Sequence, residues 1–296
     1  MKRYLSLVKF AHTLFALPFA MVGFTLGIIK SAALADGGAV LDNWWVLLLQ
    51  VLVCMVTARN SAMSFNRYLD RDIDALNPRT ASREIPAGVI STTNAKKFIA
   101  INSVIFVVAA FSINTLCGIL APVALTVLLG YSYMKRVSAL CHFVLGLALG
   151  IAPVGAFVAV TGTINLAVIL LAVIVMLWTG AFDILYSLQD EEFDRENKLH
   201  SIPELIGRRY AMIFSTVVHI SIIPLLFLFY VNIVDVIKSE TLFFIGAAIF
   251  IALLIWQHLI ISPNNLKRLN AAFFTTNGAA SLIFALFTIL SISVLL

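Results

Sequence analysis

Long, uninterrupted apolar segments separated by short polar stretches dominate this chain of 296 residues. Nine of these segments are about 17–25 residues long, the length that an α-helix needs to cross roughly 30 Å of hydrocarbon. Apolar residues do not alternate with polar ones along them, as they would in the strands of a membrane barrel. The pattern therefore predicts an all-α polytopic membrane protein with nine transmembrane helices.

The predicted spans leave little chain for a soluble domain, and we expect residues 1–296 to form a single integral-membrane domain. The first run is longer than the apolar core of a signal peptide and eight more spans follow it, so we interpret it as a retained helix. The spans cover Phe10–Ile29, the stretch from Trp44 to the polar residues near 66–74, and roughly 96–113, 116–134, 140–161, 165–188, 210–232, 241–261 and 271–295.

Composition and charge agree with this interpretation. Hydrophobic residues make up 61% of the chain and charged residues 12%, against about 25% charged residues in soluble domains. If the N-terminus is cytoplasmic, all of the 20 Lys and Arg residues except Lys30 and Lys238 lie on the cytoplasmic side, as the positive-inside rule requires. We expect a bacterial cytoplasmic (inner) membrane protein surrounded by lipid, with its charged loops in the cytoplasm and no nucleic-acid partner.

Two rows of polar residues lie where apolar spans run into charged loops. In the first acidic row, Asn66, Asp70 and Asp74 recur every four residues, so they share one face of a helix. Because the second and sixth spans cross the membrane in the same direction, both rows are expected on the cytoplasmic side. The second acidic row consists of Asp183, Tyr186, Asp190 and Asp194.

Carboxylates at the C-terminal ends of helices favour a bound cation, because the helix dipole already places partial negative charge there. Carboxylate and amide oxygens suit Mg²⁺, whereas Zn²⁺ favours His or Cys, which neither row contains. Mg²⁺ typically bridges a few carboxylates to substrate phosphates, which indicates a diphosphate substrate. The predicted metal ligands are Asn66, Asp70, Asp74, Asp190 and Asp194, and the predicted cations for the substrate are Arg83, Lys135, Arg136 and Lys198.

Non-functional explanations of the same residues remain open at this point. A row of acids at a helix end is often only a solvated face, and each basic residue is equally explained as a topology signal. His12 is interpreted as a packed or interfacial residue rather than as a metal ligand, and Cys141 and His142 have no metal-binding partner in the sequence pattern. The cysteines show no paired spacing, and we assign them neither disulfides nor metal.

The two rows resemble the two signature motifs of the UbiA-type intramembrane aromatic prenyltransferases. The loop at Arg83–Gly88 is similar to that family's Arg-Pro-x-Pro-Ser-Gly element, and Tyr131–Arg136 is similar to its Tyr-x-x-x-Lys-Arg element. The resemblance covers essentially the whole chain and is greatest to the 4-hydroxybenzoate polyprenyltransferase branch. Two departures stand out: Arg67 occupies a position where many members carry an acid, and Glu84 one where many carry proline.

The resemblance implies nine helices around a central cavity and transfer of a polyprenyl group from polyprenyl diphosphate to an aromatic ring in ubiquinone or menaquinone biosynthesis. The implied acceptor is a small aromatic acid, 4-hydroxybenzoate, and the implied cofactor is Mg²⁺. Asp70, Asp74, Asp190 and Asp194 would hold Mg²⁺ against the departing diphosphate. Tyr186 would position the diphosphate or stabilise an allylic cation, and Asp183 would orient or deprotonate the acceptor phenol.

Other functions are compatible with parts of the pattern. Within the same reaction class, the acceptor could be dihydroxynaphthoate, a haem or chlorophyll precursor, or a glycerol phosphate. From a different class, intramembrane acids also mark cation-coupled transporters. The acids here cluster at one membrane face and are absent from the last three predicted spans, which favours the enzyme.

Overall fold

The computed structural model describes residue 4, residue 7 and residues 13–34 and 43–293. Among these residues, nine helices are long and apolar enough to cross a membrane. All regular secondary structure in the described ranges is helical, which confirms the predicted all-α polytopic fold. His12 and the start of the first predicted span lie outside the described residues.

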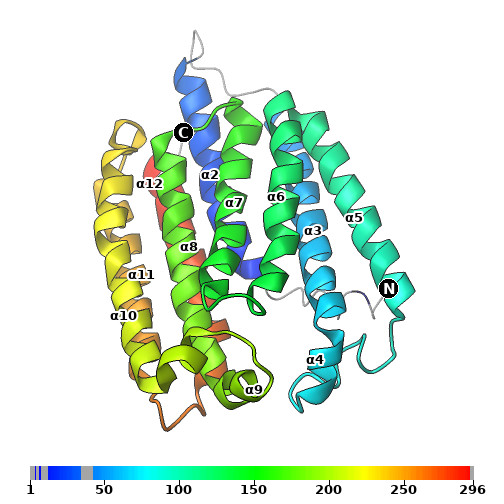
Figure 1. Ribbon diagram of the computed structural model, residues 1–296. Helices are drawn as coiled ribbons and strands as arrows, with labels where there is room; N and C mark the ends of the chain where they lie inside the picture. Colours follow the sequence, from blue (N-terminus) through cyan, green and yellow to red (C-terminus); the bar gives the residue numbers. More distant parts are fainter. Residues whose placement is uncertain (1–3, 5–6, 8–12, 35–42, 294–296) are drawn as a thin grey trace.

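The nine long helices follow the predicted spans closely, and short helical segments join some of them (Figure 1). They are α2 (Thr13–Leu34), α3 (Trp44–Leu69), α5 (Thr92–Ile113), α6 (Thr115–Met134), α7 (Cys141–Thr161), α8 (Leu166–Ser187), α10 (Ile202–Val231), α11 (Glu240–Leu259) and α12 (Asn277–Ser293), the last preceded by a π-helical turn, η4 (Ala271–Thr276).

One boundary differs in part from its prediction. Helix α10 begins at Ile202, inside the charged segment that we expected to be a loop up to Arg209, but a kink at Gly207, where φ is 79°, separates this first turn from the long helix that follows. The hydroxyl of Ser201 accepts a hydrogen bond from the backbone N–H of Glu204 at 3.3 Å, and a proline follows in the first turn. This combination caps and starts a helix regardless of the charges that follow.

Close helix contacts are made where glycines remove side-chain bulk. A Cβ atom at Gly23 of α2 would lie 2.2 Å from the carbonyl oxygen of Pro153 of α7, and one at Gly146 of α7 would lie 2.2 Å from that of Met176 of α8. In a membrane, small residues at helix interfaces let backbones approach and pack. The two glycines therefore allow α2, α7 and α8 to form a tight central group.

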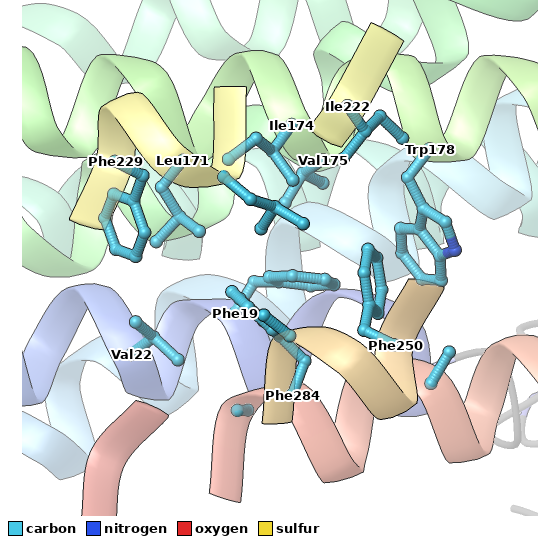
Figure 2. Packing of buried hydrophobic residues seen from close by; sticks show 14 of the residues in the cluster. Phe19, Val22, Leu171, Ile174, Val175, Trp178, Ile222, Phe229, Phe250 and Phe284 are labelled. Atoms are coloured by element: carbon cyan, nitrogen blue, oxygen red, sulfur yellow. The ribbon is translucent and has the colours of Figure 1, made fainter. Parts of the chain in front are cut away.

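The densest part of the core lies between α2, α8, α10, α11 and α12. Figure 2 shows Trp178 of α8 close to Phe19 of α2 and Phe250 of α11. The indole N–H of Trp178 donates to the side-chain oxygen of Asn277 at 3.0 Å, so this buried polar group is satisfied. In the other part of the bundle, α3, α5, α6 and α7 form smaller buried clusters around an apolar cavity.

Two short helices stand at the same end of the bundle (Figure 1). Helix α4 (Arg71–Leu76) follows α3, and α9 (Glu191–Glu196) follows α8 after a 3₁₀ turn, η2 (Leu188–Asp190). They carry the ends of the two acidic rows. The fold thus brings residues about 120 positions apart in sequence to one end of the bundle.

Candidate active site

The first acidic row keeps its helical register across the junction of α3 and α4. The backbone N–H of Asp70 donates to the carbonyl of Asn66 at 2.9 Å, and that of Asp74 donates to the carbonyl of Asp70 at 2.7 Å. The side-chain amide of Asn66 also donates to a carboxylate oxygen of Asp70 at 3.1 Å. Asn66 and Asp70 therefore lie on one face, next to each other.

The second acidic row does not stay together. The 3₁₀ turn η2 changes the helical register after α8, and Asp190 and Asp194 lie buried on η2 and α9. Asp183 lies further back on α8, where its carboxylate contacts the imidazole of His142 at 2.7 Å. Tyr186 lines a different part of the site, with its ring 4.0 Å from that of Phe273.

Each of the four carboxylates predicted to bind metal forms an ion pair with a different cation. Charge-assisted contacts of this kind are the strongest hydrogen bonds in proteins. Three of the four cations belong to the set predicted from sequence. The pairs are Asp70 with Arg136 at 2.7 Å, Asp74 with Arg83 at 2.8 Å, Asp190 with Arg79 at 2.8 Å and Asp194 with Lys135 at 2.7 Å.

Arg79 is the residue that connects the two rows. It follows α4 in the chain, yet its guanidinium reaches both carboxylate oxygens of Asp190, at 3.0 and 2.8 Å. Its guanidinium carbon also lies 5.8 Å from the ring centroid of Tyr186. The sequence prediction missed Arg79, although it stands in the polar turn Asn77–Thr80 between two prolines and beside the first row.

Lys198 does not join the site. Its side chain is exposed, its backbone has a left-handed φ of 55°, and it forms no ion pair with any other described residue. The cation that pairs with Asp190 is Arg79, which was not among the predicted residues.

Burial and pairing shift two pKa values at the mouth of the site. Burial raises the pKa of Asp70, and its hydrogen bond with Arg136 opposes this rise only in part. Burial alone would lower the pKa of Lys135, but the charge and hydrogen bond of Asp194 outweigh it, so the pKa of Lys135 lies above its usual value. Lys135 is therefore firmly charged, whereas Asp70 is neutralised by protonation more easily than an ordinary aspartate.

A polar pocket of about 570 Å³ opens beside the two rows. Arg67, Arg79 and Arg83 contribute to its wall together with Tyr186 and Asn270. Arginine side chains hold phosphate oxygens through paired N–H donors. This polar pocket suits an anionic group of the size and charge of a diphosphate.

The four carboxylates have the right chemistry for Mg²⁺. Among the described residues, no three His, Cys, Asp or Glu side chains converge on one point, so the protein does not form a complete metal cage by itself. Mg²⁺ rarely uses such a cage and is usually held by one or two carboxylates together with water and substrate phosphates. Carboxylates on both sides of a basic pocket fit that mode of binding.

An apolar cavity of about 240 Å³ lies deeper in the bundle, between α2, α3, α5, α6 and α7. Its wall is almost entirely aliphatic, with the exceptions of Arg59 and Tyr131 among its few polar members. Arg59 precedes Asn66 by seven residues on α3, which places it about 10 Å deeper along the helix axis. An arginine in the middle of an apolar span marks a functional site, and this signal was missed at the sequence level.

The arrangement matches a known family. The family model described as the UbiA prenyltransferase family matches residues 13–289. The chain belongs to the UbiA prenyltransferase family. The resemblance stated from the motifs is thereby confirmed.

Individual UbiA relatives extend over most of the chain. The 4-hydroxybenzoate octaprenyltransferase of Aliivibrio fischeri (strain MJ11) is 30% identical over 250 residues, which is 84% of each protein. The structure of a UbiA homolog from Aeropyrum pernix K1 is similar with a TM-score of 0.78 and 29% identity, and covers 93% of this chain and 96% of its own. A UbiA homolog from Archaeoglobus fulgidus bound to DMAPP and Mg²⁺ shares the fold, with a TM-score of 0.72, 19% identity and coverage of 99% and 100%.

Proposed function

We propose that this chain transfers a polyprenyl group from polyprenyl diphosphate to a ring carbon of 4-hydroxybenzoate in quinone biosynthesis, with Mg²⁺ as cofactor. The observation that carries the proposal is the contact between Arg79, which follows the first row, and Asp190 of the second row at 2.8 Å. The two acidic helix ends are thus within reach of one substrate group. The name of the Aliivibrio fischeri relative supports this acceptor.

Leaving-group stabilisation is the role that we assign to the polar pocket. The bond between the first prenyl carbon and the diphosphate oxygen breaks, and its electron pair leaves with the diphosphate. Arg79, Arg83, Lys135 and Arg136 would supply positive charge where this negative charge develops, which is the largest single term in many enzymes. Bound to Asp70, Asp74, Asp190 and Asp194, with Asn66 as a further oxygen donor, Mg²⁺ would neutralise the same charge as a Lewis acid.

The apolar cavity would hold the prenyl chain. Its wall is mostly apolar, with Cys54, Cys117 and Tyr131 among the few residues that carry a nucleophilic atom, so an allylic cation formed at its mouth would meet little water before the acceptor ring attacks. Exclusion of water prevents hydrolysis of such an intermediate. We assign the ring of Tyr186, which lines the polar pocket, to stabilise positive charge through its face.

The acceptor would lie between Arg59 and Asp183. Arg59 and Tyr131 line the apolar cavity, and Asp183 is close enough to Tyr131 for their charges to interact. Arg59 would bind the carboxylate of 4-hydroxybenzoate, and Asp183 would contact its hydroxyl group. The ring carbon beside the hydroxyl then bonds to the prenyl carbon and later loses its proton, which restores the aromatic ring.

We further propose that residues 1–296 act as one domain in the bacterial inner membrane, with the N-terminus and both acidic rows on the cytoplasmic side. The nine apolar helices support membrane insertion, and the distribution of Lys and Arg supports this orientation.

The test is an incubation of purified protein with Mg²⁺, a labelled polyprenyl diphosphate and 4-hydroxybenzoate, with dihydroxynaphthoate and a glycerol phosphate as parallel acceptors. We expect prenylated 4-hydroxybenzoate and pyrophosphate in equal amounts, and loss of both when EDTA is added. Preferred transfer to another acceptor would overturn the acceptor assignment. If no pyrophosphate is released with any acceptor, the assignment of prenyltransferase activity fails.

A further inference from the structure

The contact between Asp183 and His142 joins two helices at the edge of the site. The Nδ1 atom of His142, in the first turn of α7, lies 2.7 Å from a carboxylate oxygen of Asp183 on α8. His142 is 2% exposed, whereas the side chain of Asp183 is 23% exposed. The histidine is thus the buried member of the pair, and the carboxylate is the member that a substrate can reach.

The second nitrogen of His142 fixes its protonation. The backbone N–H of Ile202, the first residue of α10, points to Nε2 of His142 at 3.3 Å. A backbone N–H can only donate, so Nε2 accepts and carries no proton. The single ring proton of the neutral imidazole is therefore on Nδ1, where it is donated to Asp183.

Further hydrogen bonds tie the chain next to His142 to the segment that opens α10. The thiol of the neighbouring Cys141 donates to the carbonyl oxygen of His200 at 3.5 Å, and the backbone N–H of His200 donates to the carbonyl of Lys135 at 2.7 Å. The ring therefore joins α7 and α8 to the segment that opens α10. Rigid support of this kind keeps a reactive group within the narrow range of positions that catalysis requires.

We propose that His142 is a positioning residue that keeps Asp183 ionised and aimed at the hydroxyl group of the aromatic acceptor. This inference rests on the proposed function. Asp183 takes the hydroxyl proton as the neighbouring ring carbon forms the new carbon–carbon bond, giving a neutral cyclohexadienone. The ring proton then leaves to the released diphosphate, the ring regains its aromatic electrons, and the oxygen takes its proton back from Asp183.

The experiment compares His142→Leu with His142→Gln across a series of 4-hydroxybenzoates that carry fluorine on the ring and so have more acidic hydroxyl groups. A positioned base contributes about 10²-fold or more to a proton transfer, so we expect the leucine variant to lose about 10- to 100-fold in kcat with 4-hydroxybenzoate. Its KM for the diphosphate stays unchanged. The decrease in its kcat relative to wild type becomes smaller as the acceptor becomes more acidic, because a more acidic hydroxyl group depends less on a base for its deprotonation.

The glutamine variant is the conservative rescue. Its amide can donate to Asp183 and accept from Ile202 at the same time, so we expect its kcat within about 3-fold of wild type. His200→Leu is the matched control, since it removes an exposed histidine close to the same segment and leaves kcat unchanged. His142→Met repeats the test if the leucine variant does not fold.

Two results would overturn the positioning role: an unchanged kcat in the apolar variants, or an equal loss with every acceptor, which indicates only structural damage. If the wild-type protein itself prenylates none of these acceptors, the proposed function fails instead.

Discussion

The guanidinium of Arg67 on α3 forms an ion pair with the carboxylate of Glu84 in the loop after α4. These are the two positions at which the chain departs from the family motifs. Both side chains are largely buried, Arg67 being 3% exposed and Glu84 13%, so each charge neutralises the other where water has little access. The two departures are therefore one linked change, and Arg67 joins the loop to the end of α3 rather than replacing a metal ligand.

The first prediction concerns this pair. Arg67→Gln removes the cation that Glu84 contacts on α3, and the loss of one member of a buried pair costs about 3 kcal/mol of folding free energy. The reversed pair, Arg67→Glu with Glu84→Arg, recovers part of that loss. Thermal unfolding in detergent measures both.

The matched control for the pair is Arg71→Gln. Arg71 contacts Asp72 at 3.1 Å, but the Asp72 side chain is 80% exposed, and exposed pairs contribute only about 0–1 kcal/mol. Equal stability of Arg67→Gln and Arg71→Gln would show that the buried pair does not hold the loop.

A second prediction concerns Arg79. Arg79→Gln removes the charged contact to Asp190 and one of the arginines of the polar pocket, so we expect KM for the diphosphate to rise about 10- to 100-fold, as loss of a charge-assisted hydrogen bond implies. Arg195→Gln is the control, because Arg195 is exposed and pairs with Glu191 on its own helix. Steady-state kinetics with varied diphosphate concentration measures both variants. Equal KM values for the diphosphate in Arg79→Gln and Arg195→Gln would show that Arg79 does not bind the diphosphate.

The lysines allow a comparison between a predicted residue that reaches the site and one that does not. Lys135→Ala should raise KM for the diphosphate by about 10-fold or more and leave KM for the aromatic acid nearly unchanged, because Lys135 contacts Asp194 at 2.7 Å. Lys198→Ala should change neither constant, since its side chain is exposed. If the two substitutions have equal effects, Lys135 does not bind the diphosphate and serves only to set the orientation of the protein in the membrane.

Arg59 provides a test of the acceptor site. Arg59→Leu removes the cation that we assign to the carboxylate of 4-hydroxybenzoate, and we expect KM for this acceptor to rise about 10- to 100-fold. For a phenol acceptor that lacks the carboxylate, the same substitution should leave KM unchanged. If the Arg59→Leu variant turns over both acceptors equally poorly, Arg59 supports the shape of the cavity and does not bind the carboxylate of the acceptor.

The sequence was sufficient for the spans and for the first acidic row because both depend on local periodicity. Apolar length fixes the helices, and four-residue spacing places Asn66 beside Asp70. Contacts between distant segments were out of reach. Arg79 and Asp190 are 111 residues apart and His142 and Asp183 are 41 apart, and no local pattern states that these side chains meet.

The helical register of the second acidic row is the other feature that could not be predicted from the sequence. The spacing of Asp183, Tyr186 and Asp190 suggests one helical face, but the 3₁₀ turn at Leu188–Asp190 rotates the chain before α9. Asp183, before the turn, faces His142, while Asp190, within the turn, faces Arg79. A turn of this kind depends on tertiary packing around the segment, which the apolar pattern does not encode.

The central claim is that both acidic rows act on one diphosphate with Mg²⁺. It is tested most directly by measuring diphosphate binding and turnover in Asp70→Asn and Asp190→Asn, with the exposed Asp72→Asn as the control. We predict folded, membrane-inserted variants in which substitution in either row abolishes turnover and weakens Mg²⁺-dependent binding of polyprenyl diphosphate by about 100-fold, while the control behaves like wild type. Near wild-type binding and turnover in both Asp70→Asn and Asp190→Asn would contradict the account.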